Sequence, residues 1–321
     1  MMGLPWSEWN PAKPRAVRPI RRTLPGTLAR SPVLAEIECI AQSRCELGEG
    51  PLWDAASERL YWFDIKRRRL HWLRPSTAEA GAFDLPMQAS AAALRRNGEL
   101  ILATECGLAD FAPGTGVTVR QPLEPDLEGF RTNEGGVDLS GAFWWSVMDQ
   151  DGGRRPGRVY RTGPDGTRRV ADGIHIANGL CCSPDGRTMY LADSALQTLY
   201  AYELDLDRGL LGPRREFATT RHEIGTPDGA AVDEEGFVWN AQWGAWRIVR
   251  YAPDGRIDLV IPMPVEQPSS CAFGGPDLCT LYVTSARDGL RQEALEAQPL
   301  AGGVFAIQTQ TRGLPLPIFR G

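Results

Sequence analysis

The feature that most restricts the fold of this chain is an internal repeat with a period of about 40–50 residues. Six segments share one order, a turn followed by a β-rich run with an apolar or aromatic centre, as in "ASERLYWFD" and "DEEGFVWNAQ". Successive centres are 40, 43, 46, 49 and 43 residues apart. The centres are Leu60, Leu100, Phe143, Met189, Val238 and Leu281. Several strands per repeat at this period are typical of the blades of a β-propeller.

The rest of the sequence also indicates an all-β body. Alternating runs such as "RVYRTG" and "RIVRYAP" follow the central runs and predict further antiparallel strands. The 35 glycines and 25 prolines interrupt the chain throughout, and one short helix is predicted near residues 290–297. We therefore predict a single six-bladed β-propeller over residues 35–321. Residues 1–34 are basic and punctuated by proline, and we expect an irregular extension that is either disordered or lies on the surface, where Trp6 and Trp9 could hold it against the body.

Composition argues against several classes of protein. A formal net charge of -5 gives the chain no general attraction for nucleic acid. No apolar run approaches the ~20 residues that cross a bilayer, and the N-terminus lacks the continuous apolar stretch of a signal peptide. The seven cysteines include no C-x-x-C pair, which indicates reduced thiols in a cytoplasmic protein. The sequence leaves the oligomeric state open.

A polar residue recurs at one position of the repeat, eight residues before the turn of each blade. The occupants, in chain order, are Glu49, Ser90, Asn133, Asn178, Asp228 and, less regularly, Ser269 or Ser270. Equivalent positions on the innermost strands of a propeller converge on its central channel, so we expect these side chains to form a ring. A glycine follows each Glu, Asn or Asp member within two residues, which allows close approach of the backbone.

Asp228 shows why the position within the repeat matters, because this residue belongs to one of four Pro-Asp-Gly triplets. Such a triplet normally forms a tight turn, and we expect Asp165, Asp185 and Asp254 to lie in turns. Asp228 instead precedes the run "AAV", which has a turn of its own at "DEEG". We therefore expect Asp228 at the start of an innermost strand, facing the channel.

The ring predicts a metal site. Two carboxylates and two amides that face one another repel or stay unsatisfied unless something bridges them. A hard divalent cation does so, because it prefers carboxylate and amide oxygens. The alternative is that these side chains cap strands or bind channel waters. Recurrence in four blades favours one divalent metal ion, and the sequence leaves the choice among Ca, Zn, Mg, Mn and Fe(II) open.

Several motifs occur in one order along the chain and carry a resemblance to a known family. They include "LGEGPLWDAASERLYWFD", "RTNEGGVDLSGAFWWSVMD", "IANGLCCSPDGRTMYLADS" and "GTPDGAAVDEEGFVWNAQ". These segments resemble the gluconolactonase/regucalcin-like (senescence marker protein) family of sugar-lactone hydrolases. The resemblance extends from about residue 37 to about residue 308 and implies a six-bladed propeller with one divalent metal ion in its channel.

The resemblance also implies roles for individual residues. Glu49, Asn178 and Asp228 would be the metal ligands, and Asp228 would also act as general base. Arg131 and Asn133 would contact the lactone or its hydroxyl groups. The family often places an acidic substrate contact after "SVM", where both Asp149 and Asp151 are candidates and Asp151 is the one we carry forward.

Two positions depart from the pattern of the family. Glu134 stands where the family usually has Asp, so the longer side chain shifts Asn133 or alters a loop. Ala177 precedes Asn178 where Pro is usual, which makes this segment less rigid.

The expected activity is metal-dependent hydrolysis of an aldonolactone to the free aldonic acid, with a small sugar lactone, pentono- or hexono-, as the partner. The metal would act as a Lewis acid, Asp228 would deprotonate water, and the donor fork of Arg131 suits the oxygens of the substrate. The alternatives are a non-enzymatic calcium-binding or regulatory protein, an ester or organophosphate hydrolase using the same site, and a scaffold for protein partners.

A serine-hydrolase mechanism is disfavoured, because the chain has no G-x-S-x-G motif. The three histidines are His71, His175 and His222. We expect His71 on the face of a blade, and the other two in loops near the mouth of the channel, where either is a candidate for substrate contact.

Overall fold

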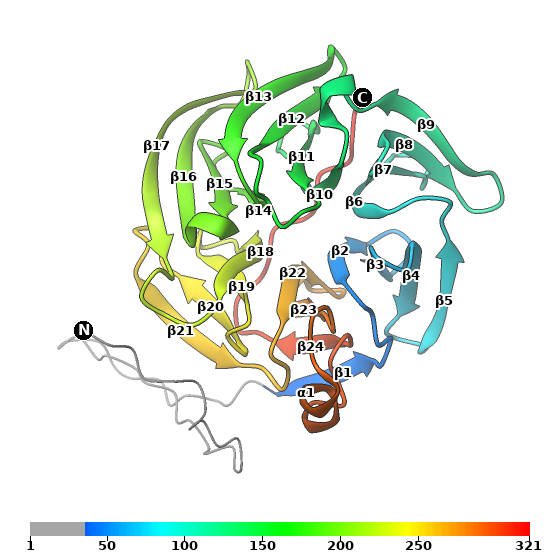
Figure 1. Cartoon of the computed structure of the whole chain (residues 1–321), viewed down its shortest axis with the longest axis vertical. Coiled ribbons are helices and arrows are strands. Elements are labelled where there is room, and N and C mark those ends of the chain that lie inside the picture. Colours follow the sequence, from blue (N-terminus) through cyan, green and yellow to red (C-terminus); the bar gives the residue numbers. More distant parts are fainter. Residues whose placement is uncertain (1–35) are drawn as a thin grey trace.

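A computed structural model describes residues 36–321 and places them in six four-stranded sheets around a central channel (Figure 1). The predicted six-bladed β-propeller is thereby confirmed. The extension predicted over residues 1–34, with Trp6 and Trp9, lies outside the described residues. Within residues 36–321 the structure contains no helix with the length and apolar character needed to span a membrane.

Five blades are built from four consecutive antiparallel strands each. The first contains β2 (Gly48–Asp54), β3 (Arg59–Asp64), β4 (Arg69–Arg74) and β5 (Glu79–Asp84). The second contains β6 (Ala89–Leu94), β7 (Leu100–Thr104), β8 (Gly107–Ala112) and β9 (Gly116–Pro122). The third contains β10 (Phe130–Val137), β11 (Phe143–Asp149), β12 (Gly157–Gly163) and β13 (Gly166–Ile174). The fourth contains β14 (Ala177–Cys182), β15 (Thr188–Asp193), β16 (Thr198–Asp205) and β17 (Leu210–Thr219). The fifth contains β18 (Thr226–Val232), β19 (Val238–Trp243), β20 (Arg247–Tyr251) and β21 (Ile257–Pro262).

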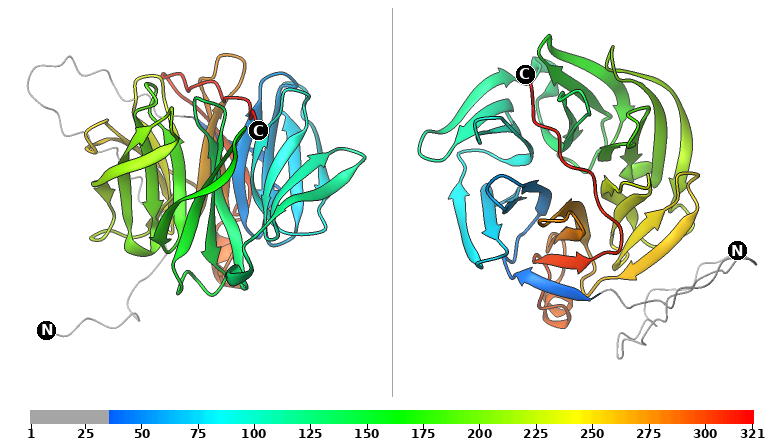
Figure 2. Two further views of the ribbon diagram at one scale, coloured as in Figure 1. Left: turned by 90° about the horizontal axis from the view of Figure 1, so that it is seen from above. Right: turned by 180° about the vertical axis from the view of Figure 1, so that it is seen from behind.

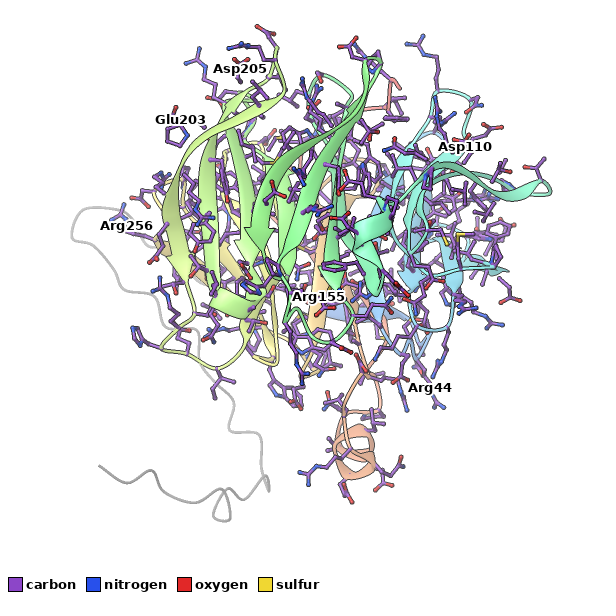
Figure 3. The ribbon with its side chains drawn as sticks, turned by 45° about the horizontal axis from the view of Figure 1, so that its top comes forward. Arg44, Asp110, Arg155, Glu203, Asp205 and Arg256 are labelled. Carbon is purple, nitrogen blue, oxygen red and sulfur yellow. The ribbon has the colours of Figure 1, made fainter. Side chains whose placement is uncertain are left out.

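The sixth blade closes the ring with strands from both ends of the described chain. It contains β22 (Pro268–Gly274), β23 (Thr280–Ser285), β24 (Val304–Gln308) and, outermost, β1 (Ile37–Ala41). The predicted short helix is α1 (Gln292–Ala297), which lies between β23 and β24 and protrudes from the body in Figure 3. Two 3₁₀ turns, η2 (Pro125–Leu127) and η3 (Ser194–Leu196), precede β10 and follow β15.

The core lies between neighbouring blades rather than at one centre. One cluster joins the second and third blades through buried side chains that include Ile101, Phe143 and Trp145. Trp145 also stacks on Tyr160 with 4.4 Å between ring centroids. Burying each such large apolar side chain contributes ~1.5–3 kcal/mol, so these contacts fix the angle between blades and the position of the innermost strands.

A buried aspartate organises the turn after the innermost strand in two of the blades. Asp233 is fully buried and accepts hydrogen bonds from Trp239 Nε1 (2.9 Å) and from Arg250 Nε (2.9 Å). The third blade repeats the arrangement with Asp138, Trp144 and Arg161. The turn that contains Asp233, in the fifth blade, is the predicted "DEEG" turn. In it the Gly236 N–H donates to the Asp233 carbonyl at 2.9 Å.

Three of the Pro-Asp-Gly triplets lie in turns and the fourth lies in a strand, as predicted. Asp165, Asp185 and Asp254 lie at the turns between β12 and β13, β14 and β15, and β20 and β21. Pro227 and Asp228 lie inside β18, the innermost strand of the fifth blade. The prediction that separated Asp228 from the other three is confirmed.

The chain after β24 crosses the channel as a strap, here called the C-terminal strap (residues 309–321), which Figure 2 shows from behind. Its backbone N–H groups bond to three different blades: Gly313 to the Leu278 carbonyl, Phe319 to the Leu94 carbonyl, and Arg320 to the Gly141 carbonyl. Phe319 is buried and packs edge-on against Phe143. The strap and α1 lie on opposite faces of the ring (Figure 2). The strap covers a cavity of about 140 Å³ between the innermost strands.

Candidate active site

Every innermost strand carries a β-bulge at the level of the predicted ring. On β18, for example, Asp228 and Gly229 together stand opposite the single residue Ala241. The same break in register occurs on β2, β6, β10, β14 and β22. A bulge redirects side chains and bends the strand. The predicted ring residues lie in these bulges or directly beside them, which explains why counting back from each turn led to them.

Close packing of the strands at the bulges requires glycine at two positions. Gly179 has φ +61°, and Gly50 has φ +55°. A Cβ atom on Gly50 would also overlap the carbonyl oxygen of Ser90 on the neighbouring blade. Left-handed backbone is strained for other residues, so glycine lets the first and second blades approach directly beside Glu49.

The serine members of the ring serve contacts between strands. Ser90 donates to Thr132 Oγ1 at 2.9 Å, and Ser269 donates to the Gly48 carbonyl at 2.5 Å. Both serines are buried. The charged and amide members of the ring, on β2, β10, β14 and β18, therefore remain as the candidates for ligand chemistry.

Arg131, Asn133 and Asn178 form a chain of hydrogen bonds from the third blade to the fourth. Arg131 Nη1 donates to Asn133 Oδ1 at 2.8 Å. Asn133 Nδ2 donates to Asn178 Oδ1 at 2.9 Å and to the Ala177 carbonyl at 3.0 Å. The structure thus brings together two residues predicted to contact substrate and one predicted metal ligand.

The chain of hydrogen bonds continues through a residue that the sequence did not single out. Asn178 Nδ2 donates to Ser194 Oγ at 2.9 Å, and Ser194 Oγ donates to the Pro227 carbonyl at 2.6 Å. Pro227 directly precedes Asp228. The only sequence signal for Ser194 is a polar residue placed directly after the apolar strand β15.

Burial and like charge dominate the electrostatics around Asp228. Burial, together with the negative charges of Glu49 and Glu134, raises the pKa of Asp228 well above its usual range. Burial and the charge of Glu134 raise the pKa of Glu49 to about 8. Burial lowers the pKa of Arg131, against the opposing charges of Glu49 and Asp228. These mutual effects show that Arg131 and the two carboxylates share one charged environment.

The donor set around Asp228 fits a hard divalent cation. Among residues 36–321, neither Glu49 nor Asp228 forms a salt bridge, so two carboxylates face the channel without a cationic partner in contact. The Asn178 Oδ1 atom accepts one hydrogen bond and retains a second lone pair. In the same range, no three His, Cys, Asp or Glu side chains form a group that could hold a metal ion, so a site here would need oxygen ligands of another kind besides these carboxylates.

Glu134 reaches the neighbouring blade. Its Oε1 accepts from the Gly135 N–H and its Oε2 accepts from the Gly179 N–H, both at 3.0 Å. Burial raises the pKa of Glu134 to about 7. The longer side chain found here in place of Asp therefore connects β10 to the peptide that follows Asn178.

The two acidic candidates after β11 have different environments. Asp149 is buried and accepts three hydrogen bonds from Arg155, through its backbone N–H, Nε and Nη2. Arg155, labelled in Figure 3, lies with its guanidinium 4.5 Å from the centroid of the Phe130 ring. Asp151 is exposed in the same loop. The carboxylate of Asp149 is thus engaged within the protein, whereas that of Asp151 is open to solvent.

The histidines lie in the predicted regions. His71 is in β4 and stacks on Trp62 with 5.2 Å between ring centroids. His175 precedes β14, where its Nδ1 lies 2.8 Å from the Gly153 carbonyl oxygen. His222 is exposed in the loop before β18. His175 is therefore tied to the loop that carries Asp151.

Comparison with known proteins identifies the family of this chain. Residues 47–287 match the SMP-30/Gluconolactonase/LRE-like region. The chain is 37% identical over 290 residues to a 6-deoxy-6-sulfogluconolactonase of Pseudomonas putida, an alignment that covers 89% of this chain and 99% of the relative. It is 36% identical over 289 residues to an L-arabinolactonase of Azospirillum brasilense, covering 88% and 95%. A solved structure of regucalcin from Agrobacterium tumefaciens, described as a calcium-binding protein, superposes with a TM-score of 0.85 at 34% identity, covering 88% and 97%. The chain belongs to the SMP-30/gluconolactonase/LRE-like family.

Proposed function

We propose that this protein hydrolyses a sugar-acid lactone (an aldonolactone) to the free aldonic acid in the channel, around Asp228. The observation that carries the proposal is a pair of carboxylates, Glu49 and Asp228, that form no salt bridge within residues 36–321 and act electrostatically on Arg131. The relatives named as a sulfogluconolactonase and an L-arabinolactonase support the substrate class.

The proposed metal ligands are the carboxylates of Glu49 and Asp228 and the Oδ1 atom of Asn178. A divalent ion bound there, whether Ca, Zn, Mg, Mn or Fe(II), would polarise the lactone carbonyl and lower the pKa of a bound water. Burial raises the pKa of both carboxyls, with the charge of Glu134 acting on Glu49 and the charges of Glu49 and Glu134 acting on Asp228, and a bound cation would offset this effect.

Asp228 is the proposed general base. Its carboxylate is only 6% exposed, and a divalent cation bound beside it would keep it ionised and able to accept a proton. General-base catalysis by a carboxylate positioned in this way contributes ~10²–10⁴-fold. The proton taken from water leaves with the alkoxide that opens from the ring.

Arg131, Asn133 and Asp151 are the proposed substrate contacts. Arg131 presents a fork of N–H donors, and its Nη1 is already oriented by Asn133 Oδ1 and by the Thr132 carbonyl at 2.8 Å each. A guanidinium held in this way is ready to bind ester or hydroxyl oxygens with little loss of freedom. Asp151 is the exposed carboxylate of the β11–β12 loop and can accept from sugar hydroxyl groups.

The proposed location is the cytoplasm. All seven cysteines are free, and Cys45 and Cys271 are buried. Burial raises the pKa of Cys45 to about 11, which keeps this thiol protonated and unreactive.

The deciding experiment is a panel of pentono- and hexonolactones in a pH-indicator assay, with protein that has been stripped of metal and resupplied with one ion at a time. We expect acid release that depends on added metal and that Asp228→Ala abolishes while its circular dichroism stays native. Full turnover in a strong chelator, or by Asp228→Ala, would contradict the proposal. Tight calcium binding without turnover of any lactone would favour the non-enzymatic alternative.

A further inference from the structure

We propose that Ser194 is a positioning residue that fixes which way the side-chain amide of Asn178 points. In this arrangement Oδ1 of Asn178, rather than Nδ2, is presented to the channel. The inference rests on the proposed function, in which Asn178 is a metal ligand through its oxygen.

The polarity of the hydrogen bonds around Ser194 leaves one arrangement. A serine hydroxyl has a single hydrogen, and Ser194 donates it to the Pro227 carbonyl at 2.6 Å. Toward Asn178 the hydroxyl can therefore only accept, and it does so from Nδ2 at 2.9 Å. A reversed amide would place Oδ1 against the hydroxyl oxygen, with two acceptors facing each other and no hydrogen between them.

The contact on the Oδ1 side of the Asn178 amide requires the same orientation of that amide. Arg131 can only donate, so Asn133 presents its Oδ1 to Arg131 and its Nδ2 to Asn178. The Ala177 carbonyl, which can only accept, takes the second hydrogen of Asn133 Nδ2. Asn178 is thus held between a donor on the third blade and the accepting oxygen of Ser194.

This polarity decides whether a cation can bind. With Oδ1 toward the channel, one lone pair accepts from Asn133 and the other is free for a metal ion. With Nδ2 toward the channel, two N–H hydrogens would meet the cation instead. Ser194 also connects Asn178 to the peptide directly before Asp228, so the proposed ligands on β14 and β18 are held in one network.

The surroundings of Ser194 keep its hydroxyl in place. The residue is 6% exposed and opens the 3₁₀ turn η3. Its backbone N–H donates to the Ile176 carbonyl at 2.9 Å, and Asp193 accepts from the Ala195 N–H at 3.2 Å. The backbone that carries the hydroxyl is therefore held by contacts that do not involve Asn178.

The test compares Ser194→Ala with Ser183→Ala in the full-length protein. Ser183 is a matched control, because it is 7% exposed and its hydroxyl also makes one donated bond, to Asp185 Oδ1, and one accepted bond, from the Thr188 N–H. It lies in the turn at the other end of β14. The measurement is the dissociation constant for Mn²⁺ by calorimetry on metal-free protein, together with the melting temperature of each variant.

We expect Ser194→Ala to weaken Mn²⁺ binding by about 10–100-fold, as is typical when the hydrogen-bond partner of a ligand is lost. Ser183→Ala should change the dissociation constant by less than about twofold at a comparable melting temperature. Ser194→Thr, which keeps a hydroxyl, should bind Mn²⁺ more tightly than Ser194→Ala. If Ser194→Ala does not fold, Ser194→Cys replaces it and should bind more weakly than Ser194→Thr, since a thiol is a weak acceptor.

Wild-type affinity in Ser194→Ala, or equal weakening by Ser183→Ala, would overturn the inference while leaving the metal site intact. A wild-type protein that binds no Mn²⁺, Ca²⁺ or Zn²⁺ would instead refute the proposed metal site, and the inference with it.

Discussion

The side-chain amide of Asn133 donates a 2.9 Å hydrogen bond to Oδ1 of Asn178, across the boundary between the third and fourth blades. Asn133 also accepts from Arg131. Replacement by Ala removes both contacts at once, so Arg131 and Asn178 lose their shared orientation. Because misplacement of positioning groups by about 1 Å costs up to ~10²-fold, we expect Asn133→Ala to lower kcat/KM for the best aldonolactone by roughly that factor.

The control for this prediction is Asn97→Ala. Asn97 lies in the exposed turn of the second blade, where its Oδ1 accepts from the Glu99 N–H. We expect it to leave kcat/KM unchanged. Equal kcat/KM for Asn133→Ala and wild type would show that the contact between the two blades does not matter to turnover.

The raised pKa values of the channel carboxylates predict how pH acts on the metal-free protein. Glu49 has a pKa of about 8 in the folded state, against 4.5 for an unperturbed glutamate. Between these values the folded state binds more protons than the unfolded state, so the free energy of unfolding falls as pH rises. We expect chelator-treated protein to lose stability progressively from about pH 4.5 to about pH 8, measured by urea denaturation.

Two comparisons sharpen this pH prediction. Glu49→Gln cannot ionise, so its stability should fall less over the same range. Added divalent metal should flatten the curve, because a bound cation favours the ionised carboxylates. A stability that rises steadily over this range in the chelator would contradict the raised pKa values of Glu49 and Asp228.

Replacement of Asp149 and replacement of Asp151 should have different effects, the first on stability and the second on substrate binding. Asp149 is buried and bonded to Arg155, so Asp149→Ala leaves a cation and its loop without their partner, and we expect a lower melting temperature. Asp151 is exposed, so Asp151→Ala should leave the melting temperature unchanged and raise KM for the lactone. The check is a thermal melt and a full kinetic curve for each variant. Unchanged KM in Asp151→Ala would remove this residue from the substrate site.

The sequence predicted the blades and the ring because both repeat at fixed intervals. Each innermost strand runs from its bulge to its turn over a nearly constant length, so counting back from the turn located Asn178 and Asp228 without any spatial information. The same regularity explained why Asp228, although part of a Pro-Asp-Gly triplet, lies inside a strand.

The contacts that the sequence did not predict join distant segments. Ser194 meets the Pro227 carbonyl 33 positions away, and Glu134 meets the Gly179 N–H 45 positions away. Neither contact repeats from blade to blade, so no periodicity indicates it. The C-terminal strap escaped prediction for a related reason, because its place across the channel depends on acceptors in three different blades.

Asp233 tests the contribution of the buried turn aspartates to stability. Its fully buried carboxylate accepts from Trp239 and from Arg250, whose side chain is only 10% exposed. Asp233→Ala leaves Trp239 Nε1 without an acceptor, while Arg250 keeps Asp258 and Glu235, and a buried donor left unsatisfied typically costs ~1–3 kcal/mol. We expect a loss of this size in urea denaturation, with metal affinity per folded molecule unchanged. Asp254→Ala, in an exposed turn, serves as the control and should stay within about 0.5 kcal/mol of wild type.

Phe319 tests whether the C-terminal strap is an integral part of the ring. Its side chain is 4% exposed and lies in the cluster that joins the second and third blades, with its ring centroid 6.3 Å from that of Phe143. Truncating a buried Phe to Ala removes these contacts and leaves a cavity, which typically costs ~3–5 kcal/mol. Leu316, on the same strap, is 40% exposed, so Leu316→Ala should cost no more than about 0.5 kcal/mol.

The measurement for the strap variants is the free energy of unfolding in urea, with limited proteolysis as a second readout. If the strap detaches in Phe319→Ala, cleavage should begin at its C-terminal end, beyond the Gly313 N–H that still bonds to Leu278. Equal stability of Phe319→Ala and Leu316→Ala would mean that the ring holds together without the strap. A large loss confined to Phe319→Ala would instead show that the strap connects blades that the pairing of β1 with β24 does not join.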